Sequence, residues 1–382
     1  MSRRPAATPR LGFLGLGWIG ALRLEAVAAA GAAEAAALCD ASPQRLAEVA
    51  GAHPGAVSCA SFEEMLERAG ELALDGVVIA TPSGLHAAQT EAALARGLAV
   101  FCQKPLTVTA EEARRVVAAA RRADRLLGVD YSYRHTDAAR ALAARLAAGE
   151  LGRLHTLDAV FHNAYGPDKA WCRDVALAGG GALVDLGVHL VDLALWMLRQ
   201  GGDGVPGLAP RVTAVHGRAL AAGEPLAGRG IDDFATARVE LAAGEGPGPG
   251  RTASLDVAAS WYAHAGRDCA FRVELWGTEG GASFHNVGGS FYDFELVLHH
   301  GREREVVSRE GGDWLGRALV AWAERLAERP GFDPEVEGSV AVAEVIDRIY
   351  GAGGEPEGRT AVAAEPSPPS GAAGGRGPQR AA

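Results

Sequence analysis

The first third of the chain alternates short apolar runs with segments whose apolar residues recur at helical spacing. Such alternation predicts an α/β fold in which a doubly wound parallel sheet is covered by helices on both faces. Buried strands are expected at residues 11–14, 35–39, 76–80, 98–102 and 126–131. Helices are expected near residues 18–30, 43–50, 61–69, 85–96 and 109–123.

After residue 131 the pattern changes to longer segments in which apolar and polar positions alternate. A helix at 136–149 precedes them, and two more helices are expected at 313–328 and 336–350. Period-two alternation predicts a large, mostly antiparallel sheet with one packed face and one face that is solvated or buried in an interface. Because a bare sheet face invites a partner, a homo-oligomer is expected. The strands are predicted at 154–163, 212–218, 233–242, 252–260, 270–276 and 291–299.

A length of 382 residues is typical of two domains, each large enough to bury a core. We predict a disordered leader at 1–9, a nucleotide-binding domain at 10–130 and a substrate and oligomerisation domain at 131–350. The segment 351–382 is rich in Gly, Pro, Ala and Glu, with Val362 as its only bulky aliphatic residue. Such a segment buries too little apolar area to offset its ordering entropy, so a disordered tail is expected.

Composition narrows the classes of function. The net charge is −10 and the arginines are scattered, which argues against nucleic acid as a partner. The sequence holds no apolar run of the roughly 20 residues that a membrane-spanning helix needs. The five cysteines are widely spaced and form no C-x-x-C pair. This spacing argues against a zinc site or a disulfide framework and fits a reducing cytoplasm.

A glycine-rich segment follows the first predicted strand and opens the first predicted helix. In Gly15-Leu16-Gly17-Trp18-Ile19-Gly20, the first glycine permits the tight turn and the second lets the backbone approach a pyrophosphate. Gly20 allows close packing of helix on strand, and the helix N-terminus offers free N–H groups to phosphates. The segment predicts dinucleotide binding, and a tight structural turn is the alternative.

The second predicted strand ends in Asp40. A carboxylate at that place accepts hydrogen bonds from the ribose hydroxyls and repels a 2′-phosphate, so NAD is favoured. Arg45, a few residues later, keeps NADP open as the alternative.

Two more segments lie where strands end, at the edge at which open parallel sheets bind ligands. The fourth strand ends in Thr81-Pro82, and His86 follows at the start of the next helix. We favour a role for His86 in that helix start over proton transfer. The fifth strand ends in Gln103-Lys104-Pro105, which is expected to place Lys104 beside the nicotinamide. An ordinary solvated lysine is the alternative.

Asp185 and His189 follow the run Gly179-Gly180-Gly181, in a segment with a helical pattern. Side chains at i and i+4 project from one helix face, so both are expected to point at the same space. A histidine beside a carboxylate is a common device for proton transfer near neutral pH. A buried structural histidine bonded to the carboxylate is the alternative.

The ordered set of these motifs resembles the Gfo/Idh/MocA oxidoreductases, which include inositol and glucose dehydrogenases and sugar ketoreductases. The resemblance spans about residues 10–350. It implies a Rossmann domain, a second domain on a large antiparallel sheet, and assembly into dimers or tetramers. It also implies Lys104, Asp185 and His189 as the catalytic residues. In the inositol dehydrogenase branch, residues that match Arg134 and Asn163 lie near the substrate. Gln103 stands where the family has Glu, which removes a negative charge beside Lys104.

The resemblance implies hydride transfer between NAD and a secondary alcohol or ketone of a cyclic polyol or sugar. His189 would be the general base in oxidation, Asp185 would bond the substrate or orient His189, and Lys104 would stabilise the alkoxide. Trp171 could stack on a sugar face, or it could be a core or interface residue. The cofactor-side residues are expected to be Gly15, Gly17, Trp18, Ile19, Gly20, Asp40, Thr81, Pro82, His86, Gln103 and Lys104. Two other functions stay open: an NAD-dependent glycoside hydrolase that oxidises the sugar transiently, and a non-catalytic nucleotide or sugar sensor.

Overall fold

The computed structural model describes residues 8–200, 211–243, 251–310 and 313–351. The predicted leader at 1–9 and the predicted tail at 351–382 lie outside these ranges, except for their innermost residues. Of the predicted leader, residues 8 and 9 are described and lead into the first strand. Of the predicted tail, only Gly351 is described, as the last residue of a helix.

The first part of the chain forms a six-stranded sheet in the order β3-β2-β1-β4-β5-β6, and each neighbouring pair is parallel. Five of the strands are those the apolar runs predict. The sixth, β3, has only two residues, too few to leave an apolar run in the sequence. The strands are β1 Arg10–Leu14, β2 Glu34–Cys39, β3 Val57–Ser58, β4 Gly76–Ile79, β5 Ala99–Cys102 and β6 Leu127–Val129.

Helices cover both faces of this sheet, as the alternation predicts. On one face α1 and α2 share a core with the sheet, and on the other α3, α4 and α5 do so. The helices are α1 Trp18–Ala29, α2 Pro43–Ala52, α3 Phe62–Glu67, α4 His86–Ala95 and α5 Ala110–Ala123. Each begins close to its predicted start. Ser42, Ser61 and Thr109 cap α2, α3 and α5 with their side chains, which fixes where these three helices begin.

The second part forms a nine-stranded sheet in the order β15-β14-β13-β12-β7-β11-β10-β8-β9. All neighbouring strands are antiparallel except the central pair β7 and β11. The strands are β7 Leu154–Asn163, β8 Arg211–Ala221, β9 Glu224–Pro225, β10 Phe234–Ala243, β11 Arg251–Ser260, β12 Cys269–Gly277, β13 Gly281–Asn286, β14 Phe294–His300 and β15 Glu303–Glu310.

Two substantial strands of this sheet were not predicted. Strand β15 has the sequence EREVVSRE and lies at the sheet edge, so it shows no apolar alternation. Strand β13 is short and pairs between β12 and β14, where tertiary context decides its conformation.

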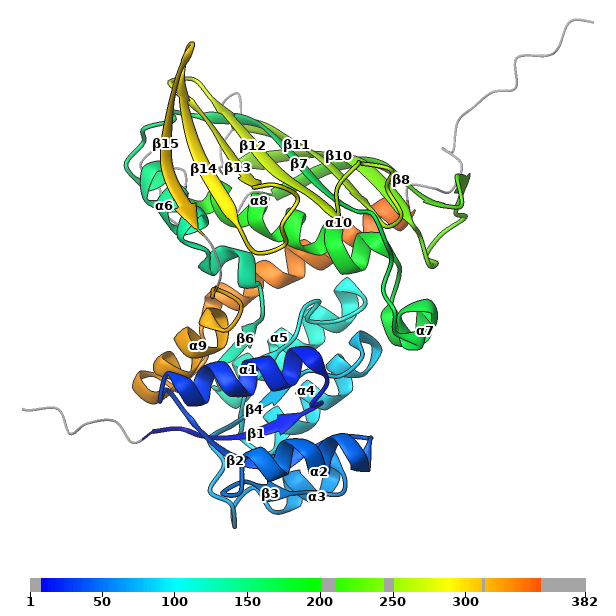
Figure 1. The fold of residues 1–382 in the computed structure, drawn as a ribbon, viewed down its shortest axis with the longest axis vertical. Coiled ribbons are helices and arrows are strands. Elements are labelled where there is room, and N and C mark those ends of the chain that lie inside the picture. The colour runs from blue at the N-terminus through cyan, green and yellow to red at the C-terminus, as the bar shows by residue number, and fades with distance from the viewer. Residues whose placement is uncertain (1–7, 201–210, 244–250, 311–312, 352–382) are drawn as a thin grey trace, which may run out of the picture.

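One face of the large sheet packs on helices, and Leu157, Ala159 and Phe161 of β7 belong to that core. Figure 1 shows α8 and α10 between the large sheet and the parallel-sheet part. The helices are α6 Asp137–Ala147, α7 Val175–Ala178, α8 Val188–Gln200, α9 Arg317–Glu328 and α10 Gly338–Gly351.

Helix α9 comes from the later part of the chain but packs on the parallel sheet beside α1 (Figure 1). Its Trp322 lies against Phe101 of β5, with ring centroids 5.6 Å apart. The chain therefore returns to its first part after completing the large sheet, and the two parts share one continuous structure.

Contrary to the expectation from the apolar runs, the stretch Val175–Gln200 is apolar and long enough to cross a membrane by length and composition. However, 78% of its apolar window is buried within the protein, as expected for a helix that packs in a core.

Candidate active site

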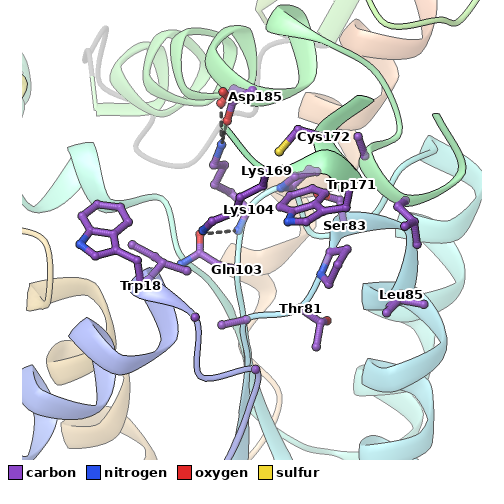
Figure 2. Close-up of a pocket in the computed structure, with 18 of the residues that line it drawn as sticks. Trp18, Thr81, Ser83, Leu85, Gln103, Lys104, Lys169, Trp171, Cys172 and Asp185 are labelled. Atoms are coloured by element: carbon purple, nitrogen blue, oxygen red, sulfur yellow. Dashed lines mark hydrogen bonds and ion pairs between the residues drawn. The ribbon is translucent and has the colours of Figure 1, made fainter. Parts of the chain in front are cut away.

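A cavity of about 1110 Å³ opens between the carboxyl ends of the parallel strands and the packed side of the large sheet. Figure 2 shows a selection of the side chains that line it, drawn from both parts of the chain. Ligand pockets in proteins commonly have volumes of roughly 300–1,000 Å³, so this cavity has room for a large ligand or for two ligands together.

The glycine-rich loop forms one wall of the cavity. Gly15 has a φ of 86°, which suits glycine, and a Cβ on Gly20 would lie 2.0 Å from the Gly15 carbonyl oxygen. A Cβ on Gly17 would meet open space, although Gly17 lines the cavity. Trp18 and Ile19 also line it, whereas Gly20 packs behind the loop. Gly17 therefore leaves an open cradle at the N-terminus of α1, where a phosphate group would fit.

Asp40 lines the cavity and also holds the glycine loop in place. Its carboxylate accepts hydrogen bonds from the backbone N–H groups of Leu16 at 2.6 Å and Ser42 at 2.8 Å. Arg45 donates to the Leu16 carbonyl oxygen at 2.6 Å, forms an ion pair with Glu48, and does not line the cavity. Of these two charged residues, only the carboxylate thus faces the cavity.

His86 lies behind the cavity wall as the first residue of α4 and is 1% exposed. Its ring nitrogens lie 2.7 Å from the Pro105 carbonyl oxygen and 2.9 Å from that of Thr81. Burial lowers the pKa of the imidazole. His86 therefore ties the loop after β4 to the loop after β5, while Thr81 and Pro82 themselves face the cavity.

Lys104 and Asp185 meet in the cavity although they lie 81 positions apart in the sequence. The Lys104 Nζ donates to Asp185 Oδ1 at 2.9 Å and to the Asp185 carbonyl oxygen at 2.5 Å (Figure 2). The other carboxylate oxygen accepts a hydrogen bond from Trp261 Nε1 at 3.2 Å. The Asp185 side chain thus accepts hydrogen bonds from Lys104 and Trp261. The imidazole of His189 makes no hydrogen bond with this carboxylate.

The segment around Asp185 also differs from the continuous α-helix that the sequence predicts. Residues Leu183–Gly187 form a single π-helical turn before α8 begins at Val188. Such turns are rare and occur most often at functional sites. Asp185 and His189 nevertheless line the same cavity.

His189 projects into the cavity beside Tyr133, with ring centroids 4.8 Å apart. Burial, followed by the positive charges of Lys104 and Arg23, lowers the pKa of His189 well below 6.5. The imidazole makes no hydrogen bond with any other residue in the described part of the chain. It is therefore neutral at physiological pH and has a ring nitrogen available to a ligand.

Gln103 connects Lys104 to a buried ion pair that the sequence analysis missed. Its amide nitrogen donates to Asp130 at 2.5 Å, and its amide oxygen accepts from the Lys104 backbone N–H at 3.1 Å. Asp130 also pairs with Arg23 at 2.5 Å, and both side chains are buried. A glutamate at position 103 would place a second carboxylate against Asp130, whereas the amide donates to it. Asp130 lies directly after β6. This position at the end of a strand is the one signal in the sequence that could have indicated Asp130 as a site residue.

Asp232 is a second residue that the sequence analysis missed. It is fully buried, and its carboxylate accepts the backbone N–H groups of Gly181 at 2.9 Å and Leu183 at 2.8 Å. The hydroxyl of Tyr350, from α10, donates to the same carboxylate. Burial raises the pKa of Asp232. These contacts fix the glycine run and the start of the π-helical turn, and nothing local in the sequence identifies them.

Of the three residues expected near a substrate, Asn163 and Trp171 line the cavity and Arg134 does not. Arg134 forms a bidentate ion pair with Asp192, with Nε at 2.8 Å from one carboxylate oxygen. Both side chains are largely buried, and a buried carboxylate holds a guanidinium strongly. Arg134 is thereby turned toward α8 and away from the cavity.

Two family profiles match this chain. One is described as an oxidoreductase family with an NAD-binding Rossmann fold and matches residues 10–131. The other is described as the GFO/IDH/MocA C-terminal domain and matches residues 139–283.

Curated proteins with known names also match. The rhizopine catabolism protein MocA of Rhizobium meliloti is 35% identical over 191 residues, which cover 50% of this chain and 57% of that protein. A 1,5-anhydro-D-fructose reductase of Ensifer adhaerens is 37% identical over 145 residues, which cover 37% of this chain and 42% of the reductase. The chain thus spans about half the length of these curated relatives.

Solved structures share the fold over a greater length. A levoglucosan dehydrogenase in complex with NADH and levoglucosan matches with a TM-score of 0.71 and 22% identity. The match covers 90% of this chain and 97% of that one. At this level of identity, the likeness concerns the fold.

Proposed function

The chain belongs to the Gfo/Idh/MocA oxidoreductase family, and from this premise we propose that it is an NAD-dependent dehydrogenase or reductase. Its substrate is a secondary alcohol, or the matching ketone, on a cyclic polyol or sugar. One observation carries the proposal: Lys104, Asp185 and His189 line the same cavity as the glycine-rich loop. The name of one relative, a 1,5-anhydro-D-fructose reductase that is 37% identical over 145 residues, supports the substrate class.

The cavity wall of the NAD(P)-binding Rossmann domain fits a dinucleotide. The open space at Gly17 and the start of α1 would hold the pyrophosphate, and Asp40 would bond the adenosine ribose. When bound, the nicotinamide supplies the hydride acceptor or donor. We propose NAD as the coenzyme because the carboxylate of Asp40 lines the cavity whereas Arg45 is held by Leu16 and Glu48.

His189 is proposed to move the hydroxyl proton. A neutral imidazole accepts the proton of a secondary alcohol as the carbonyl forms, and an imidazolium returns it in the reverse direction. The lowered pKa keeps the ring in the accepting form at neutral pH. The neighbouring Tyr133 ring limits how the imidazole can turn.

Lys104 is proposed to bond the reacting oxygen. An ammonium has three N–H donors, and two of them are directed at Asp185. The remaining donor can stabilise negative charge on the substrate oxygen as it develops. Asp185 fixes the direction of Lys104, and its free lone pairs can accept a neighbouring substrate hydroxyl.

A substrate panel tests the proposal. Inositols, aldoses and keto-sugars would each be mixed with NAD(H) or NADP(H), and the absorbance of reduced nicotinamide would be followed. We expect net reduction or oxidation of NAD(H) with at least one cyclic polyol or sugar. Sugar hydrolysis without net NADH formation would favour the hydrolase instead. Tight ligand binding with no turnover of any compound would favour the sensor.

We also propose that the protein is cytoplasmic and that it forms a homodimer or homotetramer, and the open face of the large sheet supports the assembly. This face carries cross-strand ion pairs such as Arg238 with Asp256, and Trp276 is 42% exposed on it. Sedimentation or light scattering of the full chain would test the assembly. A monomer at micromolar concentration would contradict it.

A further inference from the structure

The chain contains 35 arginines but only two lysines, Lys104 and Lys169. Both lysines line the same cavity. Arginine serves as the cation almost everywhere else, including the ion pairs on the outer surface. Lysine differs from arginine as a compact point charge on a flexible stem. Both lysines of this chain are therefore found at the cavity. The reaction proposed above uses Lys104 and leaves Lys169 without a role.

Three lysine or arginine side chains line the cavity, and two of them have acidic partners. Arg23 is paired with Asp130 at 2.5 Å, and Lys104 with Asp185 at 2.9 Å. The side chain of Lys169 is exposed, and it makes no hydrogen bond or ion pair with any residue of the described ranges. An unpaired ammonium next to a ligand site favours a ligand that carries the opposite charge.

The segment that carries Lys169 is anchored to both parts of the chain. Arg173 donates a hydrogen bond to the hydroxyl of Tyr262 at 2.6 Å. Two residues after Arg173, α7 begins and packs on the loop after β4, where a Cβ on Gly84 would lie 2.0 Å from the Ala176 carbonyl oxygen. The segment is therefore held over the cavity, and Figure 2 draws Lys169 and Trp171 among its lining side chains.

Lys169 lines the same cavity as Lys104 and Asp185, and Figure 2 draws the three side chains together. The charges of Lys104, Asp185 and Lys169 all affect the thiol of Cys172, whose pKa is raised mainly by burial. The remaining wall on this side is largely aromatic, which suits the apolar face of a sugar ring. The aromatic residues are Tyr165, Trp171, Trp261, Phe291, Tyr292 and Trp314.

We propose that Lys169 binds an anionic substituent of the substrate, a carboxylate or a phosphoryl group carried by the sugar or polyol. This inference rests on the proposed function and narrows its substrate class. Lys169 donates charge-assisted hydrogen bonds to the anion while the sugar ring packs on the aromatic wall. Lys104 and His189 remain free to act on the hydroxyl that reacts.

Binding and turnover together test the proposal. The full chain, saturated with NADH, would be titrated calorimetrically with glucuronate and with glucose 6-phosphate, and with glucose as the neutral reference. The same three sugars would be assayed for turnover with NAD. Lys169→Gln removes the charge, Lys169→Arg keeps it, and Arg302→Gln removes an exposed charge in the turn between β14 and β15.

We expect at least one anion to bind more tightly than glucose, and Lys169→Gln to weaken that binding by about tenfold or more. Glucose binding and the Kd for NADH should change by less than about threefold in the same variant, since surface substitutions have small effects. Lys169→Arg should recover part of the preference, and Arg302→Gln should leave it intact. Added salt should reduce the preference in the wild type, because exposed charges are screened.

Four results would overturn the inference. The first is equal binding of anionic and neutral sugars by the wild type. The second is an equal loss for both in Lys169→Gln. The third is a higher Kd for NADH in Lys169→Gln with unchanged sugar binding, which would assign the lysine to the coenzyme phosphates. The fourth is turnover of neutral sugars without anion preference, which would contradict this inference alone. Absence of turnover with every compound of the substrate panel would contradict the proposed function instead.

Discussion

The glycine-loop side of the cavity and the side built on the large sheet differ in how they meet a ligand. On the first side the backbone forms the surface: Gly17 leaves open space, and Asp40 is held by backbone N–H groups. On the second side, side chains from the π-helical turn, β7 and the segment around Trp171 form the surface. A backbone cradle suits a ligand that is the same in many enzymes, whereas side chains set a particular substrate and its chemistry.

The comparison predicts the largest effect for a side chain on the large-sheet side. His189→Ala should lower kcat by about 10²- to 10⁴-fold, because the proton acceptor is removed. The Kd for NADH should stay within about threefold, since the substitution leaves the glycine loop unchanged. Steady-state kinetics and fluorescence titration measure the two values.

A matched control is His155→Gln, since His155 is exposed on β7 and does not line the cavity. Turnover near that of the wild type in His189→Ala would remove His189 from the proposed mechanism.

The next effect concerns the buried support of the π-helical turn. Asp232→Ala leaves the N–H groups of Gly181 and Leu183 without their acceptor, so stability should fall by about 1–3 kcal/mol. The kcat should fall as well, because the turn carries Asp185, while the Kd for NADH stays unchanged.

Asp256→Asn on the open sheet face is the comparison variant for denaturant unfolding and kinetics. Unchanged kcat in a folded Asp232→Ala protein would show that the turn does not depend on this carboxylate.

On the glycine-loop side, substitutions at Gly17 and Gly20 distinguish an effect on NADH binding from an effect on stability. Gly17→Ala points a methyl group into open space, so it should weaken NADH binding by about tenfold, with stability changed by less than about 0.5 kcal/mol. Gly20→Ala places a methyl group 2.0 Å from a carbonyl oxygen and should cost about 1–3 kcal/mol of stability. Thermal unfolding and NADH titration of both variants would show the contrast. An unchanged Kd in Gly17→Ala would place the coenzyme elsewhere.

The smallest expected change is in the dependence of kcat/KM on pH. Because the folded pKa of His189 is lowered well below 6.5, the neutral ring persists as the pH falls through 6.5. The kcat/KM for alcohol oxidation should therefore vary by less than about twofold between pH 8 and 6.5, and fall only at lower pH. A protonation step with a midpoint at or above 6.5 would contradict the buried, neutral His189.

The parallel-sheet part could be predicted closely from the sequence, because most of its strands are continuous apolar runs and α2, α3 and α5 have local caps. The large sheet was predicted less fully, since β15 shows no apolar alternation and β13 depends on its neighbours. The same contrast holds for the site. Gly17 and Asp40 belong to a local motif, whereas the Lys104–Asp185 contact joins residues 81 positions apart. Arg134 was assigned to the substrate from a resemblance, but its pairing with Asp192 depends on the packing of α8.

The central claim is that Lys104, Asp185 and His189 surround the place where the nicotinamide meets its substrate. A crystal structure of the full chain with NADH and the sugar found in the substrate panel tests it most directly. We predict that the reacting carbon lies about 3–3.5 Å from the nicotinamide C4, with its oxygen within hydrogen-bond distance of Lys104 and His189. A nicotinamide ring bound away from these residues, or a sugar held outside this cavity, would contradict the account.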